Sequence, residues 1–135
     1  AESPIPWIHI ADAVAHQARE LGLSCLAITG TSHLMTGPVY SETLAKLGIS
    51  CKIPTEEQRQ NIDSIIFNEL VYGVIKESSR LYFNEVIQGL KEQGCDGVVL
   101  GCTEIPLIVQ PDDCPLPTLD STRLLARLAL KKALE

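Results

Sequence analysis

Three times along the chain, an amphipathic stretch of helical period ends at a glycine and is soon followed by a short apolar run. The glycines are Gly22, Gly48 and Gly94, and the runs occupy residues 25–28, 49–53 and 98–100. Glycine suits the left-handed position that closes a helix. Runs of this kind are typical of strands covered on both faces, and helices alternating with them indicate a parallel sheet. The pattern predicts a single three-layer α/β domain over residues 1–135, with a parallel, flavodoxin-like sheet.

The helices that lead to these glycines should turn their apolar faces toward the sheet. Those faces hold, in chain order, Val14, Ala15, Ala18 and Leu21, then Tyr40, Leu44 and Leu47, then Tyr82, Phe83, Val86, Ile87 and Leu90.

Further elements follow from local signals. Residues 7–10 are apolar enough for an opening strand. Thr55 and Gln58 have the T-x-x-Q spacing of a capping box, which predicts a helix with Ile62, Ile65, Ile66 and Leu70 on one face. A break near Gly73 should separate that helix from the next.

The C-terminal region combines a proline-rich segment with an unusually apolar helix. Residues 111–117 contain three prolines and predict a loop, after which Asp120 can cap a final helix over residues 120–135. The leucines and alanines of that helix cover more than one narrow stripe. Such a helix needs burial on a broad face. We therefore expect it to dock on a missing segment or on a partner subunit.

Composition excludes several classes of protein. The chain has 135 residues, of which 45% are hydrophobic and 21% charged, so disorder is not expected. The net charge of -6 and the lack of a Lys/Arg stripe argue against nucleic acid and anionic membranes as partners. No apolar run is long enough to span a bilayer, and the first residues do not resemble a signal peptide. Five cysteines without C-x-x-C spacing fit a reduced, cytoplasmic protein.

Ligands of open parallel sheets bind beyond the carboxyl ends of the strands. That rule selects residues 9–12, 30–33 and 101–104. Gly101 allows a sharp turn off its strand, which would place Cys102 at the start of a possible helix. A thiol at a helix N-terminus is partly ionised at neutral pH. Thr103 could offer its hydroxyl and its N–H to a carboxylate in the same place.

Each of these readings has a structural alternative. Cys102 could be a buried, inert thiol, as we expect for Cys25, Cys51, Cys95 and Cys114. The loop that begins at Gly30 and Thr31 has the hydroxyls and amides to bind a carboxylate, but it fits ordinary turn chemistry equally well. Thr36 or Gly37 should cap the helix that follows Pro38.

The remaining polar residues are less informative. The three histidines lack metal-ligand spacing; His16 should lie on a solvated helix face, and His9 and His33 are at best neighbours of the pocket. Asp12 could face the pocket, although capping the next helix suits it better. Five cations could each pair with a carboxylate, and nothing selects among them: Lys52, Arg59, Lys76, Arg80 and Arg123.

Residues 100–107, LGCTEIPL, resemble the second catalytic-cysteine motif of the aspartate/glutamate racemase family. Residues 5–12 resemble the stretch that opens the second half of aspartate racemases, and Gly30-Thr31 followed by Tyr40 matches a G-T…Y loop of that family. Residues 53–56 and 66–70 are also similar, so the resemblance covers nearly the whole chain.

The resemblance implies a cofactor-independent racemase of two similar α/β domains, with a small acidic amino acid bound in the cleft between them. One cysteine removes the α-proton as thiolate, and a second protonates the opposite face as thiol. Cys102 would be one of the two, and no cofactor or metal is implied. Thr103, Thr31 and Gly30 would hold the substrate's α-carboxylate, and Glu104 would support the site.

The chain departs from the family pattern in three places. The first half, with its own cysteine motif, is absent, Leu34 stands where many relatives have Thr, and Val71 falls near a Lys of some aspartate racemases. A single rigid thiol reaches only one face of a planar carbanion. We therefore expect the isolated chain to be nearly inactive without a complementary domain or a homo-oligomeric partner. Two alternatives remain: a related cysteine-dependent decarboxylase or isomerase, and a non-catalytic binding or assembly domain.

Overall fold

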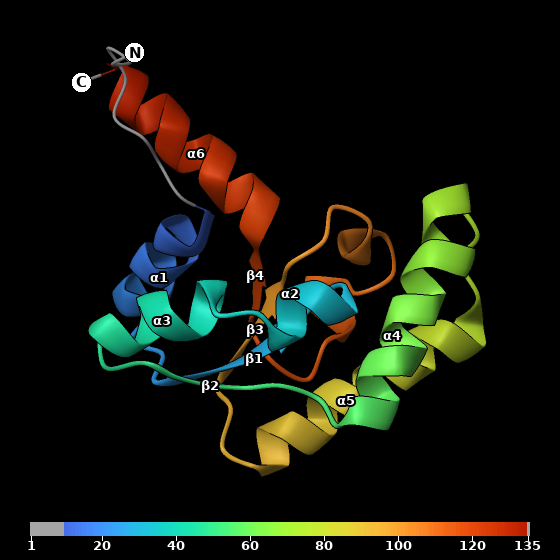
Figure 1. Cartoon of the computed structure of the whole chain (residues 1–135). Helices are drawn as coiled ribbons and strands as arrows, with labels where there is room; N and C mark the ends of the chain where they lie inside the picture. The colour runs from blue at the N-terminus through green and yellow to red at the C-terminus, as the bar shows by residue number, and fades with distance from the viewer. Residues whose placement is uncertain (1–9, 135) are drawn as a thin grey trace.

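The structure is a computed structural model that describes residues 10–134. Its centre is an all-parallel sheet of four strands, in the order β2 (Ser50–Lys52), β1 (Cys25–Thr29), β3 (Gly97–Leu100) and β4 (Thr118–Asp120). Helices cover both faces (Figure 1). The predicted three-layer α/β architecture with a parallel sheet is confirmed. The strand expected over residues 7–10 lies outside the described residues except at Ile10, where it is wrong because Ile10 begins helix α1.

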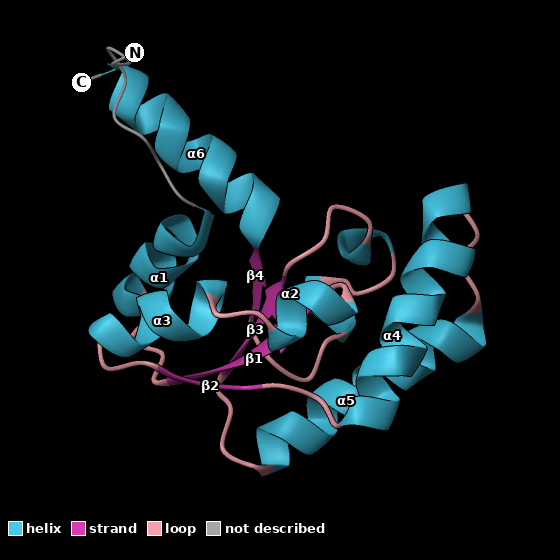
Figure 2. Cartoon of the chain, in the orientation of Figure 1, coloured by secondary structure: helices cyan, strands magenta, loops and turns pink. Residues whose placement is uncertain are grey.

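The two sheet faces have separate cores. On one face, α1 (Ile10–Glu20) and α3 (Val39–Lys46) cover Leu26, Ile28 and Val99. On the other face, α4 (Glu56–Asn68) and α5 (Glu77–Glu92) cover Ala27 and Val98. Because successive strand residues point to opposite faces, alternate residues of the same apolar strand contribute to the two cores. Figure 2 shows the strands enclosed between these helices.

The helix ends follow the local signals of the sequence. Gly22, Gly48 and Gly94 have positive φ, from +71° to +110°, as the glycine pattern predicted, and Gly73, at the predicted break, has a φ of +75°. The capping box of α4 is also present: Gln58 N–H donates to Thr55 Oγ1 at 3.2 Å, and Thr55 N–H donates to Gln58 Oε1 at 3.0 Å. Local chemistry therefore determines where most of these helices begin and end.

Some details of the predicted core are wrong. Leu21 and Leu47 are 52% and 41% exposed, because each lies just beyond its helix in the turn toward the glycine. The run over residues 49–53 forms the edge strand β2, where Ser50 and Lys52 are exposed, so it is not covered on both faces.

A fourth strand that the sequence did not predict follows the expected loop over residues 111–117. Thr118, Leu119 and Asp120 pair with Val98, Val99 and Leu100 of β3. β4 is only three residues long and directly follows Pro117, so it is too short to show a strand pattern in the sequence. The cap predicted at Asp120 is confirmed, because its Oδ1 accepts the N–H of Arg123 at 3.2 Å.

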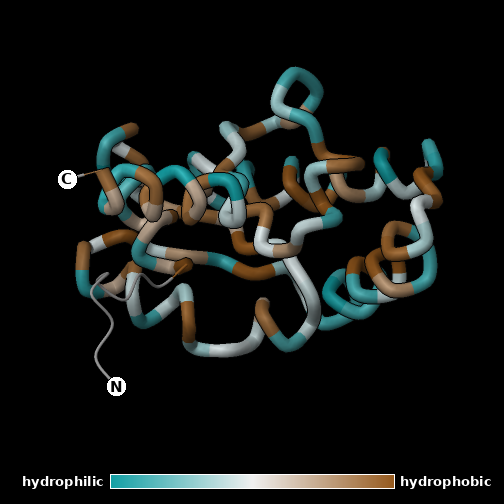
Figure 3. Tube along the Cα trace, turned by 90° about the horizontal axis from the view of Figure 1, so that it is seen from above, coloured by the Kyte–Doolittle hydropathy of each residue, from teal (hydrophilic) through white to brown (hydrophobic). Residues whose placement is uncertain are grey.

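Helix α6 (Ser121–Leu134) starts directly at the end of β4. It packs on α1 and then extends away from the sheet (Figure 1). Hydrophobic and hydrophilic residues alternate along it in Figure 3, and Leu130 and Leu134 are 61% and 79% exposed. Among residues 10–134, no helix combines the length and hydrophobicity required to cross a bilayer.

Candidate active site

The candidate site lies at the carboxyl ends of the two middle strands, β1 and β3. From β1 the chain moves to β2 on one side, whereas from β3 it moves to β4 on the other, so a topological switch point lies between β1 and β3. Gly30 directly follows β1 and Gly101 directly follows β3. The N–H of Gly101 donates to the carbonyl oxygen of Thr29 at 2.9 Å. Two of the three stretches selected from the sequence, 30–33 and 101–104, are therefore neighbours.

Leu34 joins these two stretches. A Cβ added to Gly30 would lie 2.5 Å from Leu34 Cδ2, and a Cβ added to Gly101 would lie 2.2 Å from the same atom. Neither glycine could carry a side chain without moving Leu34. The family resemblance places Thr at this position in many relatives, whereas in this chain the hydrocarbon side chain of Leu34 packs closely against both glycines.

Cys102 lies in the turn that follows, and its side chain is half-buried against the core under α4 and α5. The helix expected at this point is wrong: only a three-residue 3-10 helix forms, over Ile105–Leu107. Cys102 Sγ–H donates to Glu104 Oε2 at 2.9 Å, and Thr103 Oγ1–H donates to the same oxygen at 2.8 Å. One carboxylate oxygen therefore holds both side chains of the G-C-T-E motif.

The ionisation predicted for Cys102 is also wrong. Burial raises the pKa of the Cys102 thiol above its ordinary value, and the hydrogen bond to Glu104 raises it further. The same two hydrogen bonds, from Cys102 and Thr103, lower the pKa of Glu104. A negative charge beside a thiol disfavours the thiolate. At neutral pH, Cys102 is a neutral thiol that faces an ionised carboxylate.

The Thr31 loop is partly occupied by its own contacts. Thr31 is the N-cap of α2 (Ser32–Thr36), and its Oγ1 accepts the N–H of Leu34 at 3.3 Å. The N–H of Ser32 donates to Asp63 Oδ1 at 2.7 Å, a contact that the sequence did not suggest. The loop therefore offers a ligand fewer free amides than expected, although no residue within 10–134 accepts a hydrogen bond from the Thr31 hydroxyl. The cap expected at Thr36 or Gly37 is wrong: Pro38 itself precedes α3.

Other predicted neighbours of the pocket lie elsewhere. Asp12 is exposed within α1 and lines a groove between α1 and α6. His16 lies in the predicted solvated position and pairs with Glu20 at 3.3 Å. His33 is exposed on α2, and His9 lies outside the described residues. Tyr40 is only 2% exposed and packs in the core with Ile28 and Val99.

The remaining four cysteines are also free thiols. Cys25 and Cys95 are buried in the core, as predicted, with their sulfur atoms 3.6 Å apart. Burial and the neighbouring Cys25 raise the pKa of Cys95 to about 12. Burial also raises the pKa of the half-buried thiols Cys51 and Cys114. In residues 10–134, no three His, Cys, Asp or Glu side chains are arranged to bind a metal ion.

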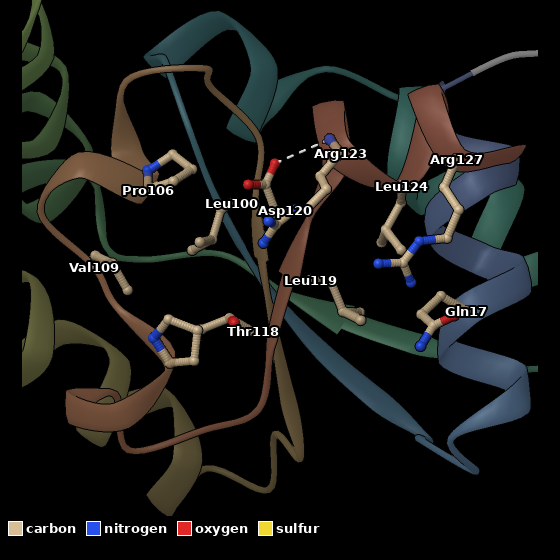
Figure 4. Close-up of a pocket in the computed structure, with 11 residues that line it drawn as sticks. Gln17, Leu100, Pro106, Val109, Thr118, Leu119, Asp120, Arg123, Leu124 and Arg127 are labelled. Carbon is tan, nitrogen blue, oxygen red and sulfur yellow. Dashed lines mark hydrogen bonds between the residues drawn. The ribbon is translucent and has the colours of Figure 1, made fainter. Parts of the chain in front are cut away.

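A cavity of about 480 Å³ lies beside β4 (Figure 4). Arg123 and Arg127 extend into it from α6, and Gln17 reaches it from α1. Leu100 and Pro106, which flank the Cys102 turn in sequence, form part of its wall. The sequence had not distinguished Arg123 from four other cations and had not suggested Arg127.

Comparisons with known proteins support the motif resemblance. The sequence model of the Asp/Glu/hydantoin racemase family matches residues 1–129. A Yersinia pestis protein assigned as an Asp/Glu racemase has a structure that is 37% identical, with a TM-score of 0.91; the match covers 96% of this chain and 57% of that one. An aspartate racemase homologue from Pyrococcus horikoshii OT3 is 30% identical, with a TM-score of 0.90 and coverages of 98% and 58%.

The aspartate racemase of Picrophilus torridus shares the fold, with a TM-score of 0.73 at 23% identity and coverages of 93% and 52%. This chain therefore spans between half and three-fifths of the length of these relatives.

Proposed function

The chain belongs to the Asp/Glu/hydantoin racemase family, and on this premise we propose that it supplies one catalytic thiol, Cys102, to a cofactor-independent racemase of acidic amino acids. The observation that carries the proposal is the position of Cys102. The thiol is half-buried at the switch point of a parallel sheet and hydrogen-bonded at 2.9 Å to Glu104. Ligands of such sheets bind at this point.

In the proposed reaction, Cys102 begins as the proton donor. A base on the opposite side of the substrate removes the proton from Cα and leaves the electron pair in a planar carbanion. Cys102 Sγ–H then gives its proton to the other face, which forms the new Cα–H bond and leaves a thiolate. The neutral state of Cys102 beside Glu104 supports this order, because a thiol that starts protonated can donate without prior titration.

The substrate's α-carboxylate would lie between the two loops. The Thr31 hydroxyl, the backbone around Gly30 and the backbone N–H of Thr103 are the donors proposed there. The Thr103 hydroxyl already donates to Glu104, so the contribution of Thr103 is through its amide. Glu104 itself acts on the thiol and not on the substrate, since a carboxylate would repel an acidic ligand.

A second wall is required for this chemistry. Carbanion formation needs a preorganised pocket that excludes water, and the second thiol has to approach from the other side. We propose that a complementary domain or a second copy of the chain provides this wall and docks on the apolar far half of α6, including Leu130 and Leu134. The isolated 135-residue chain would then be nearly inactive. Five free thiols among the described residues fit a cytoplasmic location.

The decisive experiment is exchange of the Cα proton in deuterated water, measured by mass spectrometry with each enantiomer of aspartate and glutamate. The protein assayed is the chain together with its complementary half. Cys102→Ser should abolish interconversion of the enantiomers and exchange of the enantiomer whose Cα proton faces Cys102, whereas Cys114→Ser, at another half-buried cysteine, should retain both. Full exchange in Cys102→Ser would disprove the assignment.

A second candidate follows from the family description, which includes hydantoins. A hydantoin racemase would exchange the C5 proton of a hydantoin at the same thiol. Assaying hydantoins beside the acidic amino acids separates the two reactions. If neither is processed and no acidic ligand protects Cys102 from alkylation, the chain is a non-catalytic binding or assembly domain.

A further inference from the structure

Two cysteines that the proposed reaction does not use lie in contact in the core. Cys25 begins β1, and Cys95 lies two residues before β3, so both are at the amino ends of the central strands. Their Sγ atoms are 3.6 Å apart. Cys102 follows the carboxyl end of β3, at the opposite edge of the sheet. This pair of thiols is therefore separate from the candidate active site.

Asp96 fixes the backbone around the pair. Its N–H donates to the carbonyl oxygen of Cys25 at 2.8 Å, and its carboxylate accepts the N–H of Cys25 at 3.0 Å. These bonds extend the β1–β3 ladder, in which Leu26 lies opposite Gly97. A strand spacing of about 4.8 Å and a rise of about 3.3 Å per residue place the Cα atoms of Cys25 and Cys95 about 6 Å apart. Disulfides span about 4.4–6.8 Å between Cα atoms, so this backbone spacing suits a cross-link.

The surroundings also suit a cross-link. Cys25 is 9% and Cys95 4% exposed, and Phe83, Val86 and Leu90 of α5 belong to the same apolar core. A disulfide is uncharged and leaves no polar group to satisfy there. An S–S bond is about 2.05 Å long, so the sulfur atoms have to approach by about 1.5 Å. Among the five cysteines, all within the described residues, no other two sulfur atoms are in contact.

Burial restricts the pair to a small oxidant. Cys25 is the more exposed of the two thiols, so an oxidant reaches it first. Hydrogen peroxide is little larger than water, whereas alkylating reagents are bulkier. Burial and the neighbouring Cys25 hold the pKa of Cys95 at about 12, which leaves little thiolate at neutral pH. Oxidation of the pair should therefore be slow.

We propose that Cys25 and Cys95 form an oxidative modification site, at which hydrogen peroxide joins the two thiols in a disulfide. First, the Cys25 sulfur attacks one peroxide oxygen, the O–O bond breaks, and the thiol proton leaves with the other oxygen as water. The product is a sulfenic acid on Cys25. The Cys95 sulfur then attacks the Cys25 sulfur, the S–O bond breaks, and the departing hydroxide takes the Cys95 proton as water. Each sulfur loses one electron, and the two peroxide oxygens gain these two electrons.

The disulfide would stabilise the fold. It would join residues 70 positions apart and close a loop that runs from β1 to the end of α5. A cross-link of this kind restricts the unfolded chain, so the oxidised protein should resist denaturation more than the reduced protein. The Cys102 turn lies outside the closed loop and should keep its structure.

Mass spectrometry and denaturation test the site on the 135-residue chain. The half-buried thiols are first alkylated under native conditions, and the protein is then treated with hydrogen peroxide, quenched with catalase and digested without reduction. The intact mass should fall by about 2 Da, and the digest should contain the Cys25 and Cys95 peptides joined. The midpoint of urea denaturation should rise by about 1 M and return to its starting value after dithiothreitol.

Two variants separate the pair from the other cysteines. Cys95→Ala should show neither the loss of 2 Da nor the rise in midpoint. Cys51→Ser, at a half-buried cysteine of the neighbouring strand β2, is the matched control and should form the cross-link as the parent does. The reversal by dithiothreitol is measured on the parent, so the test does not depend on the folding of a variant.

Several results would overturn the proposal. These are an unchanged mass, oxygen added to Cys25 or Cys95 without a cross-link, a disulfide that forms only in urea, and a cross-link between two chains on a non-reducing gel. An unchanged urea midpoint in the cross-linked protein would overturn the stabilising role. None of these measurements depends on proton exchange at Cα, so this site and the racemase proposal can fail separately.

Discussion

The Cδ2 atom of Leu34 lies 2.2 Å from the place that a Cβ on Gly101 would occupy. The carbonyl oxygen of Thr29 lies 2.7 Å from the same point, so backbone as well as side chain closes this space. The turn that presents Cys102 thus depends on a residue without a side chain, held by a leucine from the neighbouring loop. Gly101 of the G-C-T-E motif is therefore required because there is no space for a side chain, and not because of its backbone angles.

Gly101→Ala should therefore destabilise the fold. The added methyl group meets Leu34 and a carbonyl oxygen, and overpacking of this kind costs about 1–3 kcal/mol. The measurement is the free energy of unfolding from urea denaturation. Gly89→Ala is the matched control, because no heavy atom lies within 4 Å of its added Cβ in helix α5. That variant should be stabilised by about 0.5–1 kcal/mol, and equal destabilisation of both would contradict the role given to Leu34.

Glu104→Gln should make Cys102 more reactive. The carboxylate raises the pKa of the thiol, so replacing its charge lowers that pKa and increases the thiolate fraction at pH 8. We expect the rate of alkylation of Cys102 by iodoacetamide to rise by about threefold or more. Mass spectrometry of the Cys102 peptide measures this rate.

Glu104 is the ionisable side chain that acts on this thiol among the described residues, so no other group should mask the effect. Glu85→Gln, at an exposed glutamate of α5, should leave the rate unchanged. A slower reaction in Glu104→Gln would show that the carboxylate activates the thiol instead of restraining it.

Asp96→Asn should weaken the link between the starts of β1 and β3. The Asp96 carboxylate accepts the N–H groups of Ser24 and Cys25 at 2.9 and 3.0 Å, and the Ser24 hydroxyl at 3.0 Å. Although burial alone would raise the pKa of Asp96, these donors bring it below its ordinary value. Loss of the charged acceptor should cost about 1 kcal/mol at pH 7, measured by denaturation.

The pH dependence of that difference has a definite sign. Because the folded pKa of Asp96 lies below the unfolded value of about 3.9, its contribution is complete above that value and is lost as pH falls through the folded pKa. The parent and Asp96→Asn should therefore converge in stability below about pH 4. Asp112→Asn, in the exposed 111–113 turn, should match the parent throughout. A gap that widens in acid would refute this account.

Cys25 and Cys95 should resist alkylation in the native protein. Both are buried, and a pKa of about 12 at Cys95 leaves very little thiolate at pH 8. Peptide mapping after iodoacetamide treatment should show label on the half-buried thiols Cys51, Cys102 and Cys114 first, with Cys25 and Cys95 labelled only after guanidinium unfolding. Rapid labelling of either buried thiol under native conditions would show that this core opens locally.

Sequence reasoning succeeded where structure is decided by neighbours in the chain. The glycines that end helices, the Thr55 capping box and the cap at Asp120 depend on contacts within a few residues. The strand that leads into Gly101 was recognised by its apolar run, and the edge at which Cys102 lies followed from that strand.

The failures arose from contacts between distant segments. β4 exists because β3 lies beside it, and its own three residues carry no signal. The Ser32–Asp63 hydrogen bond joins residues 31 positions apart, and the cavity that distinguishes Arg123 needs both α1 and α6. The thiolate prediction failed because it assumed a helix after Cys102, whereas the chain placed the carboxylate of Glu104 there.

A hydrogen bond at the start of α6 connects this helix to the strand that leads into the Cys102 turn. The Ser121 hydroxyl, fully buried at the first residue of this helix, donates to the carbonyl oxygen of Leu100 at 2.9 Å. Any tilt of α6 about Ser121 has to carry that carbonyl with it or break the bond, and the next two residues are Gly101 and Cys102. A partner that binds the outer half of α6 would therefore be linked to the position of Cys102 Sγ through the Ser121–Leu100 hydrogen bond, without contacting the sulfur atom.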